Sequence, residues 1–213
     1  MVNGVERWQV GEKLPKGWKK VTLCEMSKLV SGGTPSRGNP PYFTGKIPWV
    51  KTLDLNCSVV RETEECISEE AFRAIRGELL LIGTVMVVMY GGGGTIGKSG
   101  ILGIKATTNQ AVCSILPNPE LFIPEYLHYW MVLVRPQWML HSGGNRKDPN
   151  INKGVVERMK ILLPPLPEQK RIVGILSDRL STIDKARAAT EAQLQAINAL
   201  PAALLRQAFN GEL

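Results

Sequence analysis

The pattern of hydrophobic and polar positions changes near residue 164. Before that point, short apolar runs rich in β-branched residues stand between glycine, proline and asparagine, which is typical of strands. The runs are Ile47–Val50, Thr84–Tyr90, Ile101–Ile104, Ala111–Leu116 and Met159–Leu163. They do not alternate regularly with helices, so we predict an α+β domain with a mainly antiparallel sheet.

Two helices are expected within this first part. Ser68 can cap a helix that runs to Arg76, with Gly77 ending it. Pro124 suits the first turn of a second helix, which Pro136 is expected to interrupt.

From Glu168 to Ala199 the apolar positions recur in heptads, and Gly174 is the only glycine in this stretch. One row consists of Val173, Leu180, Arg187, Leu194 and Pro201, and the row three residues later of Leu176, Ile183, Thr190, Ile197 and Leu204. Such rows form the a/d seam of a coiled coil, here with a polar central layer. The apolar residues expected to form a dimerisation seam are Val173, Leu176, Leu180, Ile183, Leu194 and Ile197.

The segment Pro164-Pro165-Leu166-Pro167 separates the two patterns. Three prolines in four residues hold an extended chain that cannot continue a strand ladder, and Pro167 suits the first helical position. One alternative is a helix that packs on its own domain, although a stiff hinge favours a helix that leaves it. We therefore predict a domain at residues 1–163, a proline hinge at 164–167 and a long helix at 168–213.

Pro201 is expected to break or kink this helix. Ala202–Phe209 would then form a last short helix that ends at Asn210-Gly211.

The charge is moderately basic and lies mostly in the first part. The 213 residues carry a formal net charge of +7, and residues 1–166 hold 20 Lys and Arg against 14 Asp and Glu. A basic domain favours nucleic acid or an anionic membrane as a partner. The polar start of the chain does not resemble a signal peptide, and the apolar run Leu79–Tyr90 is too short to span a bilayer. We expect a cytoplasmic chain with no membrane partner.

The cysteines and histidines do not predict a metal site. Cys24, Cys57, Cys66 and Cys113 include no Cys-x-x-Cys pair, and neither histidine is close to a cysteine in the sequence. Reduced, buried thiols are expected, with no zinc site and no disulfide framework.

Two motifs would indicate an enzyme, and neither has the context that its chemistry requires. Gly92–Ser99 fits the phosphate-binding pattern G-x-x-x-x-G-K-[ST], but the residues that follow predict a strand where that motif needs a helix. Asn39-Pro40-Pro41-Tyr42 spells the tetrapeptide of amino-group DNA methyltransferases, but it follows a loop instead of a buried strand. We expect a glycine-rich hairpin at the first motif, no catalytic residues and no cofactor.

Seven short segments occur in a recognisable order over nearly the whole chain. They are Leu14–Trp18, Ser31–Ser36, Ile47–Val50, Gly94–Lys98, Thr108–Gln110, Leu163–Gln169 and Leu204–Leu213. In this order and spacing they resemble the target-recognition domain and long helix of type I restriction–modification specificity subunits.

The resemblance implies a function and partners. Such subunits catalyse nothing and read a bipartite site on double-stranded DNA, with one half for each recognition domain. Two long helices pair antiparallel, and the methyltransferase and restriction subunits assemble on this scaffold. The methyltransferase subunits modify an adenine in each half-site.

This chain departs from the family in its length. It has one recognition domain and one helix, so it resembles half of a subunit. It is either a natural half-subunit that forms a homodimer or a truncated chain. A second departure is the run Gly91–Gly94, where family members often carry an arginine.

The resemblance also divides the candidate DNA contacts into two groups. Segments shared by proteins that recognise different sequences cannot read the bases, so Thr34, Thr95 and Lys98 are expected to form turns and position phosphates. Base contacts are expected in polar loops particular to this chain. With Ser36 of the first loop, the remaining candidates are Arg37, Asn39, Tyr90, Asn145, Arg146 and Lys147.

Three functions remain open from the sequence. The first is a non-catalytic DNA-binding scaffold, and the second is an enzyme that uses the Gly92 loop or the Asn39 tetrapeptide. The third is an interaction protein of the same fold that blocks assembly of the complex.

Overall fold

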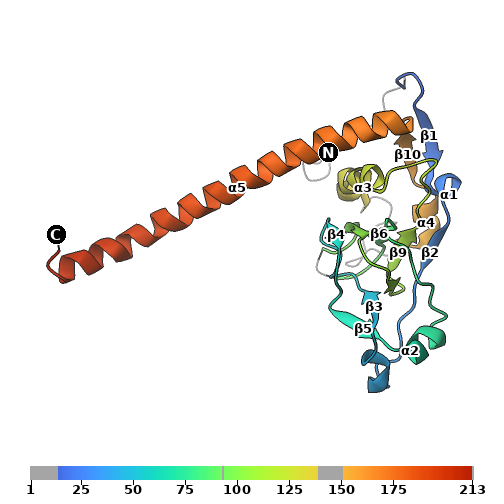
Figure 1. Cartoon of the computed structure of the whole chain (residues 1–213), viewed down its shortest axis with the longest axis horizontal. Coiled ribbons are helices and arrows are strands. Elements are labelled where there is room, and N and C mark those ends of the chain that lie inside the picture. Colours follow the sequence, from blue (N-terminus) through green and yellow to red (C-terminus); the bar gives the residue numbers. More distant parts are fainter. Residues whose placement is uncertain (1–13, 93, 139–150, 213) are drawn as a thin grey trace. The chain divides into compact units, whose positions relative to one another are not determined.

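Ten strands form three sheets in the part of the chain that the computed structural model describes, residues 14–92, 94–138 and 151–212 (Figure 1). The two-stranded sheet pairs β1 (Lys19–Thr22) with β10 (Lys160–Leu163). The five-stranded sheet has the order β2 (Leu29–Ser31), β9 (Val112–Ile115), β6 (Val85–Val88), β7 (Ser99–Leu102) and β4 (Val59–Val60). The three-stranded sheet has the order β5 (Glu65–Ile67), β3 (Ile47–Val50) and β8 (Thr107–Thr108). The chain divides after Lys170 into two compact units.

Antiparallel pairing predominates in these sheets, as the sequence predicted. The pairs β1–β10, β2–β9, β3–β5, β6–β7 and β6–β9 are antiparallel, whereas β3–β8 and β4–β7 are parallel. Each of the five predicted strand segments contains a strand, namely β3, β6, β7, β9 or β10. The α+β class with a mainly antiparallel sheet is therefore confirmed.

Helices and turns connect the strands. They are α1 (Leu23–Met26), η1 (Pro40–Phe43), α2 (Glu69–Ala74), α3 (Pro124–Trp138), α4 (Lys153–Glu157) and α5 (Leu166–Phe209). The predicted cap of α2 is confirmed, because the Ser68 hydroxyl accepts a hydrogen bond from the Ala71 amide at 3.2 Å. This helix ends two residues before Arg76, which has a positive φ of 51°.

Helix α3 begins at Pro124 as predicted, but the prediction that Pro136 interrupts it is wrong. The helix continues through Pro136 to Trp138. Pro136 cannot donate to the carbonyl of Val132, yet Val132 is exposed, where solvent can bind such a carbonyl. Trp138 is buried to 1% exposure, and its packing stabilises the last turn.

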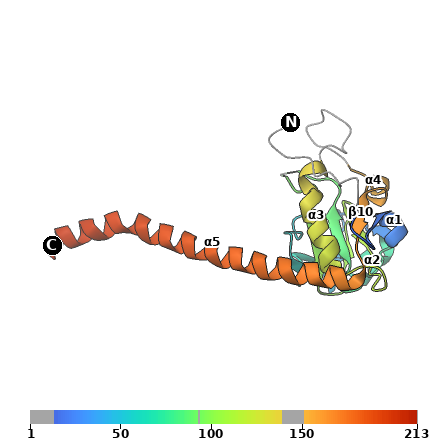
Figure 2. The same ribbon diagram turned by 90° about the horizontal axis from the view of Figure 1, so that it is seen from above.

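Strand β6 lies at the centre of the main core. Its four residues are fully buried, and Met86 and Val88 share one cluster with seven residues from other parts of the chain. Side chains alternate along a strand, so Val85 and Val87 face the opposite side. Helix α3 packs against β6 and β7 (Figure 2). The members of the cluster are Val50, Leu55, Val60, Leu80, Met86, Val88, Leu102, Ala106 and Val112.

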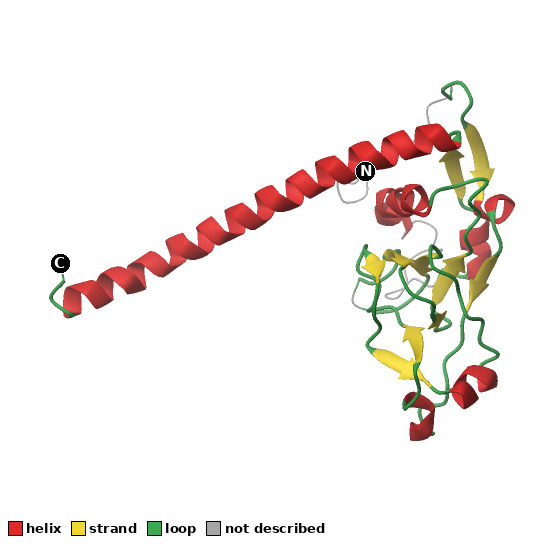
Figure 3. Cartoon of the chain, in the orientation of Figure 1, coloured by secondary structure: helices red, strands yellow, loops and turns green. Residues whose placement is uncertain are grey.

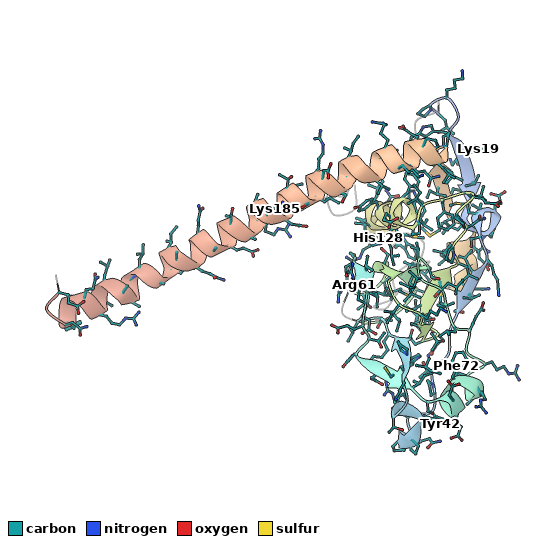
Figure 4. The ribbon with its side chains drawn as sticks, viewed as in Figure 1. Lys19, Tyr42, Arg61, Phe72, His128 and Lys185 are labelled. Carbon is teal, nitrogen blue, oxygen red and sulfur yellow. The ribbon has the colours of Figure 1, made fainter. Side chains whose placement is uncertain are left out.

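A second core lies around the three-stranded sheet. Trp49, Ile67 and Ala71 are buried at its centre, and η1 and α2 contribute partly buried rings that include Tyr42 and Phe72. Both rings are labelled in Figure 4, at the end of the first unit where η1 and α2 lie. Leu163 and Ile161 of β10 are buried in the two-stranded sheet at the other end.

The four cysteines are free thiols. Cys113 is buried, and burial raises the pKa of its thiol to about 12. Cys24 is exposed on α1, which differs from the expectation that the thiols are buried.

The first turn of α5 is fixed by one buried side chain, Gln169. Its carboxamide oxygen accepts from the Ile123 amide at 2.9 Å, and its nitrogen donates to the carbonyls of Leu121 and Pro164, each at 2.9 Å. Gln169 is fully buried, and these bonds pair its polar side-chain atoms with the backbone.

The second unit, residues 171–213, contains the rest of α5. The prediction of a separate last helix is wrong, since α5 includes Pro201 and ends at Phe209. A bend in its red, C-terminal part is visible in Figure 2 and accords with the kink expected at a proline. The predicted stop at Asn210-Gly211 is confirmed. Gly211 has a positive φ of 74°, and the Glu212 amide donates to the carbonyl of Gln207.

We predict that Gln169→Ala lowers the free energy of unfolding by about 2–5 kcal/mol, because it removes a buried side chain and its three hydrogen bonds to the backbone. Urea denaturation would measure this change. Lys170→Ala is the control, since Lys170 is exposed and its removal should change stability by less than about 0.5 kcal/mol. Equal midpoints for the two variants would contradict the anchoring role.

Candidate nucleic-acid interface

Four loops meet at one end of the two larger sheets. Antiparallel register places the last residue of β2 opposite Cys113 of β9 and the last residue of β6 opposite Val112. Strands β2, β3, β6 and β8 therefore end here, and strands β7 and β9 begin here. We call these loops the rim; they comprise residues 32–39, 51–58, 89–98 and 109–111, drawn mainly as green loop in Figure 3.

Hydrogen bonds between loops hold the rim together. The Thr34 hydroxyl contacts the carboxamide of Gln110, and the Lys98 ammonium donates to the Asn56 side chain at 3.4 Å. The Asn109 amide donates to the carbonyl of Val50 at 2.9 Å. Two of the predicted contact residues, Thr34 and Lys98, thus lie on the same surface although they are far apart in the sequence.

The loop between β6 and β7 is the predicted glycine-rich hairpin. Lys98 is followed directly by strand β7, so the loop does not open the helix that a nucleotide-binding motif requires. Gly94 and Gly97 have φ values of +72° and +70°, which favour glycine over any other residue. Gly97 also lies so close to α3 that an added Cβ would come within 2.9 Å of Arg135 Cγ and 3.2 Å of Trp138 Cγ.

Arg135 of α3 supports this loop from below. Its guanidinium donates to the carbonyl of Gly94 at 2.7 Å and to that of Ile96 at 3.3 Å. Thr95 is only 3% exposed, and its hydroxyl donates to the Gly92 carbonyl at 3.0 Å. Of the two roles expected for Thr95, this geometry favours turn formation over contact with a phosphate.

The segment after β3 is held by His128 of α3, which is labelled in Figure 4. Nε2 of His128 lies 3.3 Å from the carbonyl of Cys57, a residue with a positive φ of 56°. A carbonyl only accepts, so Nε2 carries a proton and neutral Nδ1 accepts from the Ser99 hydroxyl at 3.1 Å. Burial lowers the pKa of His128, although the bond to Cys57 opposes this. The neutral ring thus fixes the backbone of this rim loop.

Arg37 is part of a charge cluster. Its guanidinium donates two hydrogen bonds to the carboxylate of Glu65, at 2.7 and 3.1 Å, and lies 4.3 Å from the centre of the Phe43 ring. The Lys51 ammonium lies 2.5 Å from Glu65 and 2.8 Å from Glu64. The bonds from Arg37, followed by those from Lys51, lower the pKa of Glu65 to about 2. Glu65 is therefore charged at neutral pH, and so are Arg37 and Lys51, whose pKa values are raised.

The other predicted contact residues differ in their exposure. Ser36 is exposed, whereas Asn39 is half-buried and precedes the short 3-10 helix η1. The tetrapeptide that begins at Asn39 thus lies in a turn and does not end a buried strand. Tyr90 is half-buried at the start of the glycine loop, and burial raises the pKa of its hydroxyl.

Asn145, Arg146 and Lys147 lie outside the described residues. The described residues that flank them both contact the glycine-rich loop. Trp138 packs beneath Gly97, and the Ile151 amide donates to the carbonyl of Met89 at 3.1 Å.

Four residues of this region were not predicted from the sequence: Lys51, Asn56 and Gln110 of the rim, and Arg135 of α3. A partial signal existed for Gln110, which belongs to one of the segments that carry the family resemblance. Lys51 and Asn56 come from the segment after β3, where residues 53–64 line a shallow depression of about 430 Å³ that includes Arg61, labelled in Figure 4. Arg135 looks like an ordinary helix residue until the fold brings α3 beneath the loop.

The described residues contain no group of three or more His, Cys, Asp and Glu side chains placed to hold a metal ion. In the same part of the chain, no helix combines the length and hydrophobicity needed to cross a membrane.

Comparison with protein families gives one match that covers most of the chain. Residues 15–197 match the family described as "Type I restriction modification DNA specificity domain". The chain is 29% identical over 174 residues to the "Type I restriction enzyme EcoR124I/EcoR124II specificity subunit" of Escherichia coli, a match covering 78% of this chain and 41% of that protein. It is 25% identical over 169 residues to the MjaIX specificity subunit of Methanocaldococcus jannaschii, covering 78% and 38% respectively. The chain thus spans about two fifths of the length of these relatives.

Solved structures share the fold. A chain of a type I R-M system superposes with a TM-score of 0.73 at 22% identity, covering 95% of this chain and 48% of that one. The HsdS subunit from Thermoanaerobacter tengcongensis gives a TM-score of 0.65, also at 22% identity, with 95% and 47% covered. At this identity the likeness establishes the arrangement of the elements and not the contacts that they make.

We predict that Gly97→Ala destabilises the chain by about 1–3 kcal/mol, because a Cβ there meets α3 and the backbone has a positive φ. Thermal unfolding followed by circular dichroism would measure it. Gly92→Ala is the matched control, since a Cβ at Gly92 meets no atom within 4 Å. If Gly97→Ala is as stable as Gly92→Ala, the loop does not depend on its contact with α3.

Proposed function

The chain belongs to the type I restriction modification DNA specificity family, and from this we propose that its rim reads one half of a bipartite site on double-stranded DNA. The observation that carries the proposal is the convergence of four loops from distant parts of the sequence at one end of the sheets. Loops on a rigid scaffold suit sequence recognition, because their side chains can vary without changing the core.

Within the rim, the shared segments and the individual loops have different tasks. Lys98 and the turn that contains Thr34 position the sugar–phosphate backbone. Arg37, Asn39 and Tyr90 lie in loops particular to this chain and contribute to reading the bases. Ser36 ends the shared segment Ser31–Ser36 and remains a candidate DNA contact beside them. Asn145, Arg146 and Lys147 remain candidates for the same task.

The chain recognises DNA and leaves catalysis to its partners. Methyltransferase subunits would modify an adenine in the half-site, and restriction subunits would join them in the complete complex. The names of the relatives as specificity subunits of restriction enzymes support this division of labour. The compartment in which such a complex meets host DNA is the cytoplasm.

The chain is organised as a recognition domain at residues 1–163, a proline hinge at 164–167 and a helix for dimerisation and subunit docking at 168–213. The bonds of Gln169 support a firm junction, because they tie the first helical turn to the loop at residues 121–123. Leu166 and Pro167 of this segment already belong to α5, so the helix begins two residues earlier than the sequence predicted.

A homodimer through α5 would complete the bipartite site. Leu180, Ile183, Leu194 and Ile197 are each between 43% and 60% exposed, and soluble proteins rarely leave such a stripe uncovered. In an antiparallel pair centred between Arg187 and Thr190, Leu180 meets Ile197 of the second copy. Arg187 then lies near Thr190 and Glu191 of that copy. Such a dimer reads a palindromic site in two halves with a fixed gap.

The polar layer is compatible with this seam. The Thr190 hydroxyl donates to the carbonyl of Ala186 at 2.9 Å, so it needs no partner from another helix. Arg187 can direct its guanidinium to the edge of the seam, where Glu191 or Asp184 provides a carboxylate.

We predict that Lys98→Ala weakens binding to all DNA sequences about equally in the complex with a methyltransferase subunit. Loss of one phosphate contact should reduce the slope of log affinity against log salt by about 0.9. Fluorescence anisotropy at several salt concentrations would measure both effects. Lys105→Ala is the matched control, since Lys105 is exposed beyond the other end of β7 and should leave the slope unchanged. A changed sequence preference in Lys98→Ala would contradict the positioning role.

We predict that the purified chain is a dimer at micromolar concentration and that Leu180→Glu makes it a monomer, because a charge in the seam would be buried. Light scattering measures the mass directly. Ala192→Glu adds the same charge on the opposite side of the heptad and should leave the dimer intact. A wild-type chain that is monomeric under these conditions would exclude the homodimer and favour a missing second half.

A further inference from the structure

We propose that Arg37 reads a guanine of the DNA half-site, and that Glu65, Lys51 and the Phe43 ring hold its guanidinium in position for this contact. The inference rests on the proposed function and identifies both the base and the residue that determines specificity for it.

The guanidinium of Arg37 is fixed on two sides. Two hydrogen bonds to the Glu65 carboxylate, at 2.7 and 3.1 Å, define its plane. Ring faces restrict it from another direction, since its central carbon lies 4.3 Å from the centre of Phe43 and 5.4 Å from that of Trp49. An arginine side chain normally loses rotational freedom on binding, and here much of that cost is met in the free protein.

The supporting groups are themselves held in place. Glu65 begins strand β5, and the Lys51 ammonium binds its Oε1 at 2.5 Å. The Trp49 indole donates to the Gly33 carbonyl at 3.1 Å, which fixes the loop that carries Arg37. The Gly33 amide donates to the carbonyl of Thr108 at 3.0 Å. Movement of the Arg37 side chain would break its two bonds to Glu65, and movement of its loop would also break the bonds of Gly33.

A guanidinium has five N–H donors, of which Glu65 uses two. The remaining donors include the pair along the Nε edge, and two parallel donors match the O6 and N7 acceptors of guanine in the major groove. The Arg37 side chain is 57% exposed, so a DNA base can approach the guanidinium from solvent. The arrangement is that of a prepared base contact.

The charge of the cluster favours a base over a phosphate. Arg37 and Lys51 are balanced by Glu64 and Glu65, so an approaching phosphate meets a locally neutral group with carboxylates beside the guanidinium. The edge of a guanine is uncharged, and it accepts two hydrogen bonds without approaching those carboxylates as an anion. Lys98, whose ammonium donates to the uncharged Asn56 side chain, suits a phosphate better.

The test uses the complex of the full chain with a methyltransferase subunit. Selection from random DNA duplexes first identifies the half-site that the wild-type complex prefers. Binding is then compared for wild type, Arg37→Ala, Arg37→Lys, Glu65→Gln and Glu64→Gln. Arg37→Lys retains the charge, so discrimination at the guanine can still be measured with it if Arg37→Ala fails to fold.

Arg37→Ala and Arg37→Lys should each lower discrimination at one guanine by about 5- to 150-fold. Replacing that guanine by 7-deazaguanine removes the N7 acceptor, and it should weaken the wild-type complex but not the Arg37 variants. Glu65→Gln should lower discrimination at the same base pair by a smaller factor. Glu64→Gln is the matched control and should preserve it, because Glu64 binds only Lys51 among the cluster and its side chain is 64% exposed.

Two results would overturn the inference. If Arg37→Ala weakens binding to all sequences equally and lowers the salt slope, the residue contacts a phosphate. If the Arg37 variants keep the wild-type preference and affinity, the cluster is structural. A wild-type complex that selects no sequence would instead reject the proposed function itself, and this result is separate because it appears before any variant is made.

Discussion

Strand β6 must have both of its edges paired, because it is buried on both faces. Its four residues are inaccessible to water, so each backbone N–H and C=O needs a partner within the sheet. Strand β7 supplies partners on one edge and β9 on the other. Helix α3 and the main hydrophobic cluster then cover the two faces. This central antiparallel triplet brings the loop between β6 and β7 and the loop before β9 to the same end of the sheet.

Local features of the sequence predicted the elements well and their partners poorly. Apolar runs located β3, β6, β7, β9 and β10, because burial imposes a pattern on each strand separately. The parallel pairs β3–β8 and β4–β7 join segments without any pattern that links them. Proline was given too much weight at Pro136 and Pro201, where each helix continues through the residue. A proline removes one backbone hydrogen bond and disturbs about one helical turn, whereas the other hydrogen bonds of a long helix are kept.

The candidate site shows the same division. The family resemblance predicted Thr34 and Lys98 as DNA contacts, and the polar character of its loop predicted Arg37; the structure places all three on the rim. Their immediate partners could not be foreseen, since Glu65 lies 28 residues from Arg37 and Gln110 lies 76 residues from Thr34. Composition misleads here as well. A basic surplus suggests free cations, yet Arg37 and Lys51 are paired with carboxylates in this fold.

The pairing of Arg37 with Glu65 has a consequence for fidelity. A free cation that binds DNA releases counterions, so its contribution weakens as ionic strength rises. A contact with the uncharged edge of a guanine neutralises no phosphate, so it releases no counterions from the DNA and depends little on salt. Affinity for the sugar–phosphate backbone and discrimination between sequences would then respond differently to ionic strength in the cell. Rising ionic strength would shorten the time spent on every DNA sequence while leaving the ratio between correct and incorrect sites nearly constant.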